Sequence, residues 1–253
     1  MINTNAIYVL WLREVKKFIR AKSRIIGMLG MPLFFLAFLG FGFSSMPVAG
    51  MPEVDYITFL IPGIISMGMV FTSMFAGISV LWDRQFGFLK EIMVAPVKRV
   101  SIVIGRVLGG VTTSLVQGLM ILAIGLLVGL AITSIVGFFL SIVFMALLSA
   151  TFIGVGLIIA SKMRDMQGFQ LVVNFLVLPL VFLSGALFPL DNLPEFIRIA
   201  AFLNPITYGV DGMRAALIGI STLPILYDFI ALIIFSSLTV FLGAYFFEKG
   251  ENI

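Results

Sequence analysis

The side chains that perform most enzyme chemistry are missing from this chain. Its 253 residues include no histidine and no cysteine, which removes the commonest general base, the commonest metal ligand and every thiolate. The acids that remain stand mostly at the ends of apolar segments. A polarised nucleophile or a metal-bound water inside a membrane therefore cannot be assembled in the usual ways. We expect no enzyme activity from the chain itself.

A nucleotide-binding loop is missing as well. A loop that cradles phosphates needs glycines followed by Lys and then by Ser or Thr, and the sequence contains no Gly-Lys pair. We therefore expect the chain to bind no cofactor. If ATP drives its activity, the nucleotide must be hydrolysed by another polypeptide.

The longest polar segment runs over residues 82–106 and contains five of the sixteen Lys and Arg residues. Within it, residues 84–95 alternate between apolar and charged side chains at helical spacing. A helix of this length cannot cross a membrane, so we expect it to bury its apolar side on a partner protein. The alternative is a solvated loop that only supplies positive charge. The apolar side comprises Phe86, Leu89, Ile92 and Met93, and the charged side Arg84, Lys90 and Glu91.

A second polar segment covers residues 189–224. It contains Asn204-Pro205, a sequence typical of a helix start, and Asp211 and Arg214, whose spacing allows them to pair on one helical face. Neither half is long enough to span a bilayer. We expect a re-entrant or interfacial helical hairpin.

The composition places these segments in a membrane protein. The chain is 61% hydrophobic and 11% charged, compared with about 25% charged residues in soluble domains. A crossing helix needs about 20 apolar residues, and the apolar runs supply six spans in one all-α domain over residues 1–253. The predicted spans are 25–43, 57–81, two within 107–161 joined near 131–134, 166–188 and 229–247.

Residues 4–24 form a predicted amphipathic helix in the headgroup region. Trp11 belongs to its apolar face, and the opposite side carries four cations, as in helices that lie along a membrane surface. The alternative is an ordinary charged flank of the first span. The cations are Arg13, Lys16, Lys17 and Arg20.

The distribution of Lys and Arg predicts the orientation. Fourteen of the sixteen belong to the N-terminus, the 82–106 segment, residues 162–164 and the C-terminus. The positive-inside rule then places both termini and the 82–106 segment in the cytoplasm, and residues 189–224 outside. Because the cations flank spans, the net charge of +4 does not indicate a nucleic-acid partner.

Within the predicted spans the polar side chains are uncharged. Gln117, Gln170 and Asn174 are expected to form interhelical hydrogen bonds. The absence of an ionisable residue disfavours, without eliminating, a stand-alone ion-coupled secondary transporter. Gly105 and Gly109, four residues apart, allow close helix approach, within the chain or between two copies.

The sequence resembles the permeases of the type-2 exporter family of ABC (ATP-binding cassette) transporters. Asp83-Arg84-Gln85-Phe86-Gly87-Phe88-Leu89-Lys90-Glu91-Ile92-Met93-Val94-Ala95-Pro96 is similar to the family's Arg-x-x-Gly-x-Leu-Glu/Lys-Glu-hydrophobic-x-Ala-Pro pattern. Residues 193–214, with Asn204-Pro205, resemble its extracytoplasmic Asn-Pro…Arg signature. The six-span layout extends the likeness over nearly the whole chain.

The resemblance implies a multi-pass permease of the cell membrane that exports a hydrophobic or amphipathic substrate (drug, lipid or lipid-linked glycan). A second permease copy, most simply identical, and two copies of an ATPase that binds ATP and Mg would complete it. It implies that residues 189–224 gate the exit; the alternative is a structural plug that shields the span ends, and the two roles can coexist. The coupling residues would be Arg84, Phe86, Gly87, Leu89, Lys90, Glu91, Ile92, Met93, Ala95 and Pro96, the gate residues Pro194, Asn204, Pro205, Tyr208, Asp211 and Arg214, and the interfacial-helix residues Trp11, Arg13, Lys17 and Arg20.

Overall fold

The computed structural model describes residues 3–43, 54–85, 99–163, 165–190 and 194–249. Every regular element among these residues is a helix, which confirms the predicted all-α class.

Five helical stretches are long and apolar enough to cross a membrane. The predicted fifth span corresponds to α8 (Met166–Phe182), a shorter apolar helix whose 17 residues extend about 26 Å. The six-span layout therefore stays a prediction. The five stretches are Lys22–Phe41 (α2, Lys22–Phe35, and the π-helical η1, Leu36–Phe41), Tyr56–Asp83 (α3, Tyr56–Ala76, and most of α4, Ile78–Gln85), Val100–Val128 (in α6, Arg99–Val128), Ile135–Lys162 (α7) and Ile225–Lys249 (α11).

The predicted turn between the third and fourth spans is confirmed. Helix α6 ends at Val128 and α7 begins at Ile135. Gly129 has a φ of +119°, a conformation that favours glycine. The Ser134 side chain then caps α7 by accepting a hydrogen bond from the Val136 N–H at 3.2 Å.

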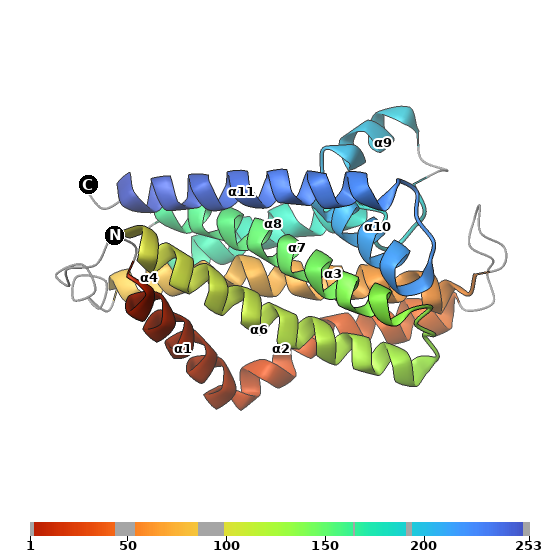
Figure 1. Ribbon diagram of the computed structural model, residues 1–253, viewed down its shortest axis with the longest axis horizontal. Coiled ribbons are helices and arrows are strands. Elements are labelled where there is room, and N and C mark those ends of the chain that lie inside the picture. The colour runs from red at the N-terminus through yellow and green to blue at the C-terminus, as the bar shows by residue number, and fades with distance from the viewer. Residues whose placement is uncertain (1–2, 44–53, 86–98, 164, 191–193, 250–253) are drawn as a thin grey trace.

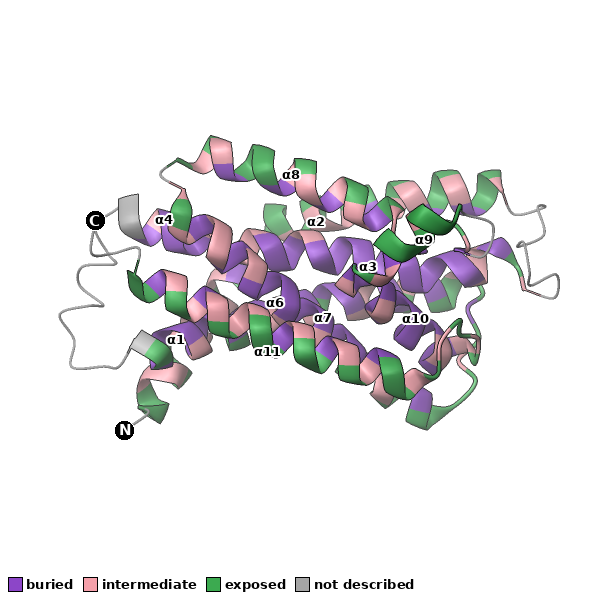
Figure 2. Cartoon of the chain, turned by 90° about the horizontal axis from the view of Figure 1, so that it is seen from above, coloured by how far each residue is buried: buried purple, intermediate pink, exposed green. Residues whose placement is uncertain are grey.

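The centre of the bundle is α3, which is buried along most of its length (Figure 2). It packs against α6, α7 and α10, while α2 and α11 have the lowest buried fractions of the candidate spans. Gly77 and Gly156 let α7 approach the junction of α3 and α4, because a Cβ on Gly77 would stand 2.5 Å from the Gly156 carbonyl carbon. Because α2 and α11 are the least buried of the candidate spans, their exposed sides can contact lipid or a partner.

The helices run along the long axis of the molecule and divide the polar segments between its two ends (Figure 1). One end, which we call the terminal end, holds both chain termini, α1 (Thr4–Arg20) and α4. The other, the hairpin end, holds α9 (Glu195–Phe202) and α10 (Pro205–Ile218). Helix α1 lies against α6 and joins α2 at Ala21, whose φ of −90° and ψ of 67° interrupt the helix.

Candidate functional site

The predicted coupling segment is flanked by α4 and α6. Arg84 lies in α4, and the other nine predicted coupling residues, which fall within 86–98, lie outside the described residues. The structure therefore describes the two helices from which this segment departs and to which it returns. Helix α4 and the start of α6 lie at the terminal end (Figure 1).

Next to this segment lies a group that we call the ion cluster, made of Arg13, Asp83 and Arg106. The Arg13 guanidinium donates two hydrogen bonds to Asp83, from Nη2 to Oδ1 at 2.6 Å and from Nη1 to Oδ2 at 3.2 Å. Arg106 Nη2 donates to Asp83 Oδ2 at 2.6 Å, and its Nη1 to Ser79 Oγ at 3.2 Å. Asp83 and Arg106 are each 4% exposed. One buried carboxylate thus joins α1, α4 and α6.

Two further residues of the predicted interfacial helix contact α6 and α4. Trp11 Nε1 donates to Thr112 Oγ1 of α6 at 2.9 Å, and Lys17 Nζ lies 4.5 Å from the centre of the Trp82 ring. Arg20 is exposed. Arg13 differs from the prediction, since its guanidinium turns inward to a carboxylate instead of outward with the other cations. Burial lowers the pKa of Lys17, while Glu14 and Asp83 act in the opposite direction.

Two glycines of α6 explain why α1 lies so close. A Cβ on Gly105 would stand 2.9 Å from Leu10 Cβ, and one on Gly109 would stand 2.7 Å from Glu14 Cβ. The four-residue glycine spacing therefore fits α6 to α1 of the same chain. Of the two roles that the sequence left open, the structure supports packing within one chain.

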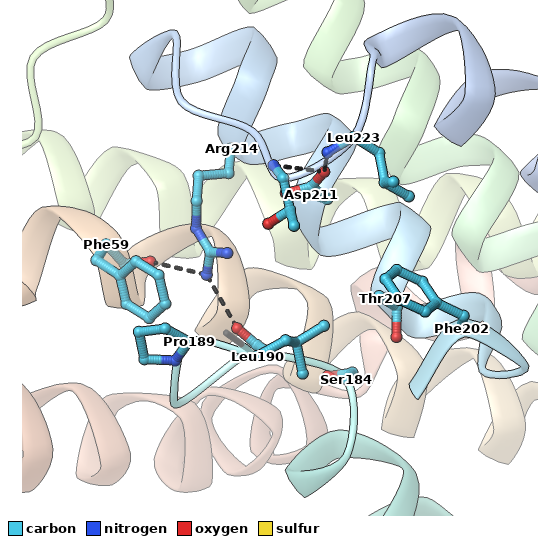
Figure 3. Close-up of a pocket in the computed structure, with 11 residues that line it drawn as sticks. Phe59, Ser184, Pro189, Leu190, Phe202, Thr207, Asp211, Arg214 and Leu223 are labelled. Carbon is cyan, nitrogen blue, oxygen red and sulfur yellow. Dashed lines mark hydrogen bonds between the residues drawn. The ribbon is translucent and has the colours of Figure 1, made fainter. Parts of the chain in front are cut away.

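At the hairpin end, Asp211 and Arg214 lie in a small pocket (Figure 3). The Asp211 carboxylate accepts hydrogen bonds from the N–H of Thr222, at 2.9 and 3.0 Å, and of Leu223, at 2.8 Å. Arg214 Nη2 donates to the carbonyls of Phe59 and Gly185, each at 3.2 Å, and its guanidinium carbon lies 3.8 Å from the Phe59 ring centre. Burial lowers the pKa of Arg214, against the influence of Asp211, but a guanidinium group in a protein stays charged at neutral pH.

The predicted pairing of Asp211 with Arg214 is wrong. No ion pair joins these two described residues, because each charge binds backbone groups of another element. Asp211 holds the start of the connection to α11, and Arg214 holds α3 and the turn that follows α8. We call Asn204, Tyr208, Asp211 and Arg214 the hairpin cluster.

The Asn-Pro pair has a clear local role. The Asn204 side chain caps α10 by accepting from the Ile206 N–H at 3.0 Å, and its Nδ2 donates to the Leu180 carbonyl of α8 at 2.6 Å. Pro205 occupies the first turn, where its missing N–H costs nothing. Tyr208 Oη donates to the Phe202 carbonyl at 2.6 Å, and Pro194 precedes α9 as its N-cap residue. These contacts tie α9, α10 and α8 together.

A groove of about 410 Å³ lies between α2, α3, α6 and α8. Its lining combines methionines such as Met28 and Met31 with the amides Gln117, Gln170 and Asn174. Gln117 forms the predicted interhelical bond, from Nε2 to the Met28 carbonyl at 2.9 Å, but its buried Oε1 has no partner among the described residues. The other two amides form no side-chain hydrogen bond within the part of the chain that the structure describes, and Gln170 is exposed.

Asp228 was missed by the sequence-based reasoning. The sixth span was predicted to begin at Phe229, whereas α11 begins at Ile225 and carries Asp228 in its first turn. The side chain is fully buried, and neither carboxylate oxygen has a hydrogen-bond partner in the described part of the chain. The predicted sixth span, 229–247, left this residue out, whereas α11 includes it. Exact span limits were needed to find it.

The described residues include no cluster of three His, Cys, Asp or Glu side chains suited to a metal ion. The described residues at the two ends of the molecule form instead salt bridges, helix caps and aromatic contacts. These arrangements can join and orient helices, and the groove can accommodate an apolar molecule with a hydrogen-bond donor.

Comparison with known proteins gives a consistent result. The family profile described as ABC-2 type transporter matches residues 5–218. The inner membrane transport permease YadH of Escherichia coli K12 is 30% identical over 235 residues, which cover 91% of this chain and 90% of YadH. The putative transport permease ycf38 of Cyanophora paradoxa is 30% identical over 78% of this chain and 70% of its own. The probable multidrug ABC transporter permease YbhR of Escherichia coli K12 is 27% identical over 63% of this chain and 44% of its own.

Proposed function

Because the chain belongs to the ABC-2 type transporter membrane family, we propose that it is the permease subunit of an exporter driven by a separate ATPase. The family match over residues 5–218 carries this proposal. The match includes the 82–106 segment and residues 189–218 of the predicted hairpin. Transport permeases of this kind have no nucleotide site of their own, so two ATPase subunits would bind ATP and Mg and deliver the energy through the coupling segment.

The groove supports a path for the transported molecule. Its amides lie beside methionines and phenylalanines, which suits a hydrophobic or amphipathic molecule with at least one hydrogen-bond donor. The name of the relative YbhR, a probable multidrug permease, agrees with a cargo of this class. Among the described residues that line the groove, Arg24 is the charged one, so an uncharged or anionic cargo fits better than a polycation.

A second copy of the chain would complete the groove. Gln170 and Asn174 lie on α8 beside exposed apolar residues such as Leu171 and Phe175. An amide left facing lipid has no hydrogen-bond partner there, which is costly. We therefore place α8 at a homodimer interface, where a second protomer or the cargo covers these amides.

The remaining topology follows from the Lys and Arg distribution. In the proposed arrangement α8 is the fifth of six crossings of the cell membrane, and both termini face the cytoplasm together with the terminal end. Helices α9 and α10 form the extracytoplasmic re-entrant hairpin, whose cluster closes the exit of the path. The ATPase docks at the terminal end through residues 84–96.

Co-purification tests the central claim. We expect an ATPase to purify with the affinity-tagged chain from its native membrane, and Leu89→Asp to remove it, because a charge would replace an apolar docking residue. Leu203→Asp is the matched control, since Leu203 is 74% exposed at the hairpin end, and it should keep the ATPase bound. An ATPase that stays bound to Leu89→Asp, or none bound to the unaltered chain, contradicts the proposal.

Asp228 favours one alternative, a stand-alone ion-coupled transporter, since buried ionisable groups in membrane spans often mark ion pathways. Uptake by the purified single chain in liposomes, driven by a proton or sodium gradient, would establish it. The same uptake should then disappear in Asp228→Asn. We expect no gradient-driven flux from the single chain.

A further inference from the structure

The ion cluster connects the proposed coupling segment to the rest of the molecule. Asp83 is three residues before residue 86, where that segment leaves α4, and Arg106 lies in the third turn of α6, where the chain has returned. Arg13 belongs to neither flank but to α1. Both arginine side chains bind the single carboxylate of Asp83, and each guanidinium lies 2.6 Å from it.

The cluster is built to hold these helices together. Asp83 is buried and receives two guanidinium groups, so its loss would leave Arg106 buried without a counter-charge in the described part of the chain. Removing one partner of a buried ion pair is far more disruptive than removing a surface pair. Helix α4 has a second link to α1 through Lys17 and Trp82. A displacement of α4 must therefore move α1, α6 or both.

Both receiving helices lead to the groove. Helix α1 continues into α2 at Ala21, and α2 contributes Met28 and Met31 to the groove wall. Helix α6 contributes Gln117, which donates a hydrogen bond to the Met28 carbonyl of α2. The cluster thus stands between the segment that would bind the ATPase and the two helices that line the proposed path.

We propose that Asp83 is a positioning residue that relays movement of the 86–98 segment along two arms, through Arg13 to α1 and α2 and through Arg106 to α6. This inference rests on the proposed function, because the movement originates in the partner ATPase. Each arm has its own ion pair, so each pair can be removed separately, while the contact of Lys17 with Trp82 remains in the first arm.

Single-cysteine reporters can follow the two arms, because the chain has no cysteine of its own. Met31→Cys reports on α2 and Val116→Cys on α6; these side chains are 40% and 37% exposed. The permease is labelled with a bimane maleimide, reconstituted with its co-purifying ATPase, and its emission is recorded before and after ATP, Mg²⁺ and vanadate are added. With the ion cluster unaltered, we expect the bimane emission of both reporters to shift.

The variants then separate the arms. Arg13→Gln should reduce the shift at Met31→Cys, where the contact of Lys17 with Trp82 still links α4 to α1, and should preserve the shift at Val116→Cys. Asp83→Asn should reduce both shifts. Resting emission should stay unchanged, which a purely structural defect would not allow. Asp165→Asn is the matched control, because Asp165 also lies at the terminal end but caps α8, a role that Asn fills equally well. It should keep both shifts.

Several results would overturn the relay. The relay is wrong if Asp83→Asn keeps the full emission shift at both reporters, or if Arg13→Gln changes the shift equally at both. It is also wrong if the emission of neither reporter shifts in the unaltered chain while its bound ATPase hydrolyses ATP. If Asp83→Asn is not recovered as folded protein, Arg13→Gln decides, since the Arg13 side chain is 30% exposed and its loss leaves the Arg106 pair in place. The absence of any co-purifying ATPase overturns the proposed function instead.

Discussion

The ion cluster and the hairpin cluster satisfy their buried charges in different ways. In the ion cluster, side chains of three helices bind one another, and Asp83 accepts from Arg13 and Arg106. In the hairpin cluster, Asp211 and Arg214 bind backbone groups of other segments. Substitutions can remove all the charged groups of a side-chain network together. At the hairpin, substitutions remove only the side chains and leave the backbone groups without their partners.

The difference suggests different mechanical roles. Ion pairs between helices can shift together with the helices that carry them, because each partner has its own side-chain freedom. Charges bound to backbone fix the path of the chain itself, as Asp211 does at residues 222–223. We therefore expect the terminal end to transmit movement and the hairpin end to resist it until a whole segment is displaced.

The largest expected effect is the loss of Asp83. Asp83→Leu removes the carboxylate that the buried Arg106 binds, and we expect a loss of about 3–5 kcal/mol in unfolding free energy. The triple variant Arg13→Gln, Asp83→Leu, Arg106→Leu should recover most of this loss, because apolar replacement of a whole buried network is often nearly neutral. Reversible unfolding in mixed detergent micelles measures both. A triple variant as unstable as Asp83→Leu would contradict the contrast between the clusters.

A smaller effect is expected for Arg214→Leu, about 2–4 kcal/mol by the same measurement. Two carbonyls would lose a charged donor, and the contact with the Phe59 ring would disappear. No second side-chain substitution should restore stability, since the stranded groups are backbone. The control is Arg198→Leu on α9, whose exposed side chain should contribute almost nothing. Recovery of Arg214→Leu by Asp211→Leu would show that the two charges act as a pair after all.

The sequence predicted the elements well because their signals are local. Continuous apolar runs located the spans, the turn near 131–134 was confirmed, and Asn204-Pro205 does start α10. The predicted fifth span is the exception in length, since α8 ends at Phe182 and Pro179 lies in its last turn.

The contacts between elements could not be predicted because they depend on packing. Arg13 and Asp83 are 70 positions apart, and no periodicity in either segment indicates that they meet. Asp211 and Arg214, three positions apart, were expected to pair, yet the surrounding backbone offered both of them better partners. Asp228 shows how much depends on the exact helix limits, since α11 begins four residues before the predicted span and therefore includes a buried carboxylate.

The smallest expected effect distinguishes a backbone-bound acid from an exposed one. Asp211→Asn keeps one oxygen, which at the Oδ2 position can accept from both N–H groups, but the Thr222 N–H loses its second acceptor and the remaining bonds lose their charged acceptor. We expect a loss of about 1–2 kcal/mol. Asp55→Asn is the matched control, because exposed Asp55 precedes α3 without a side-chain cap bond and should be neutral. If the two variants lost equal amounts of stability, Asp211 would act only through its net charge and not through its bonds to the backbone. The contrast between the hairpin cluster and the ion cluster would then fail.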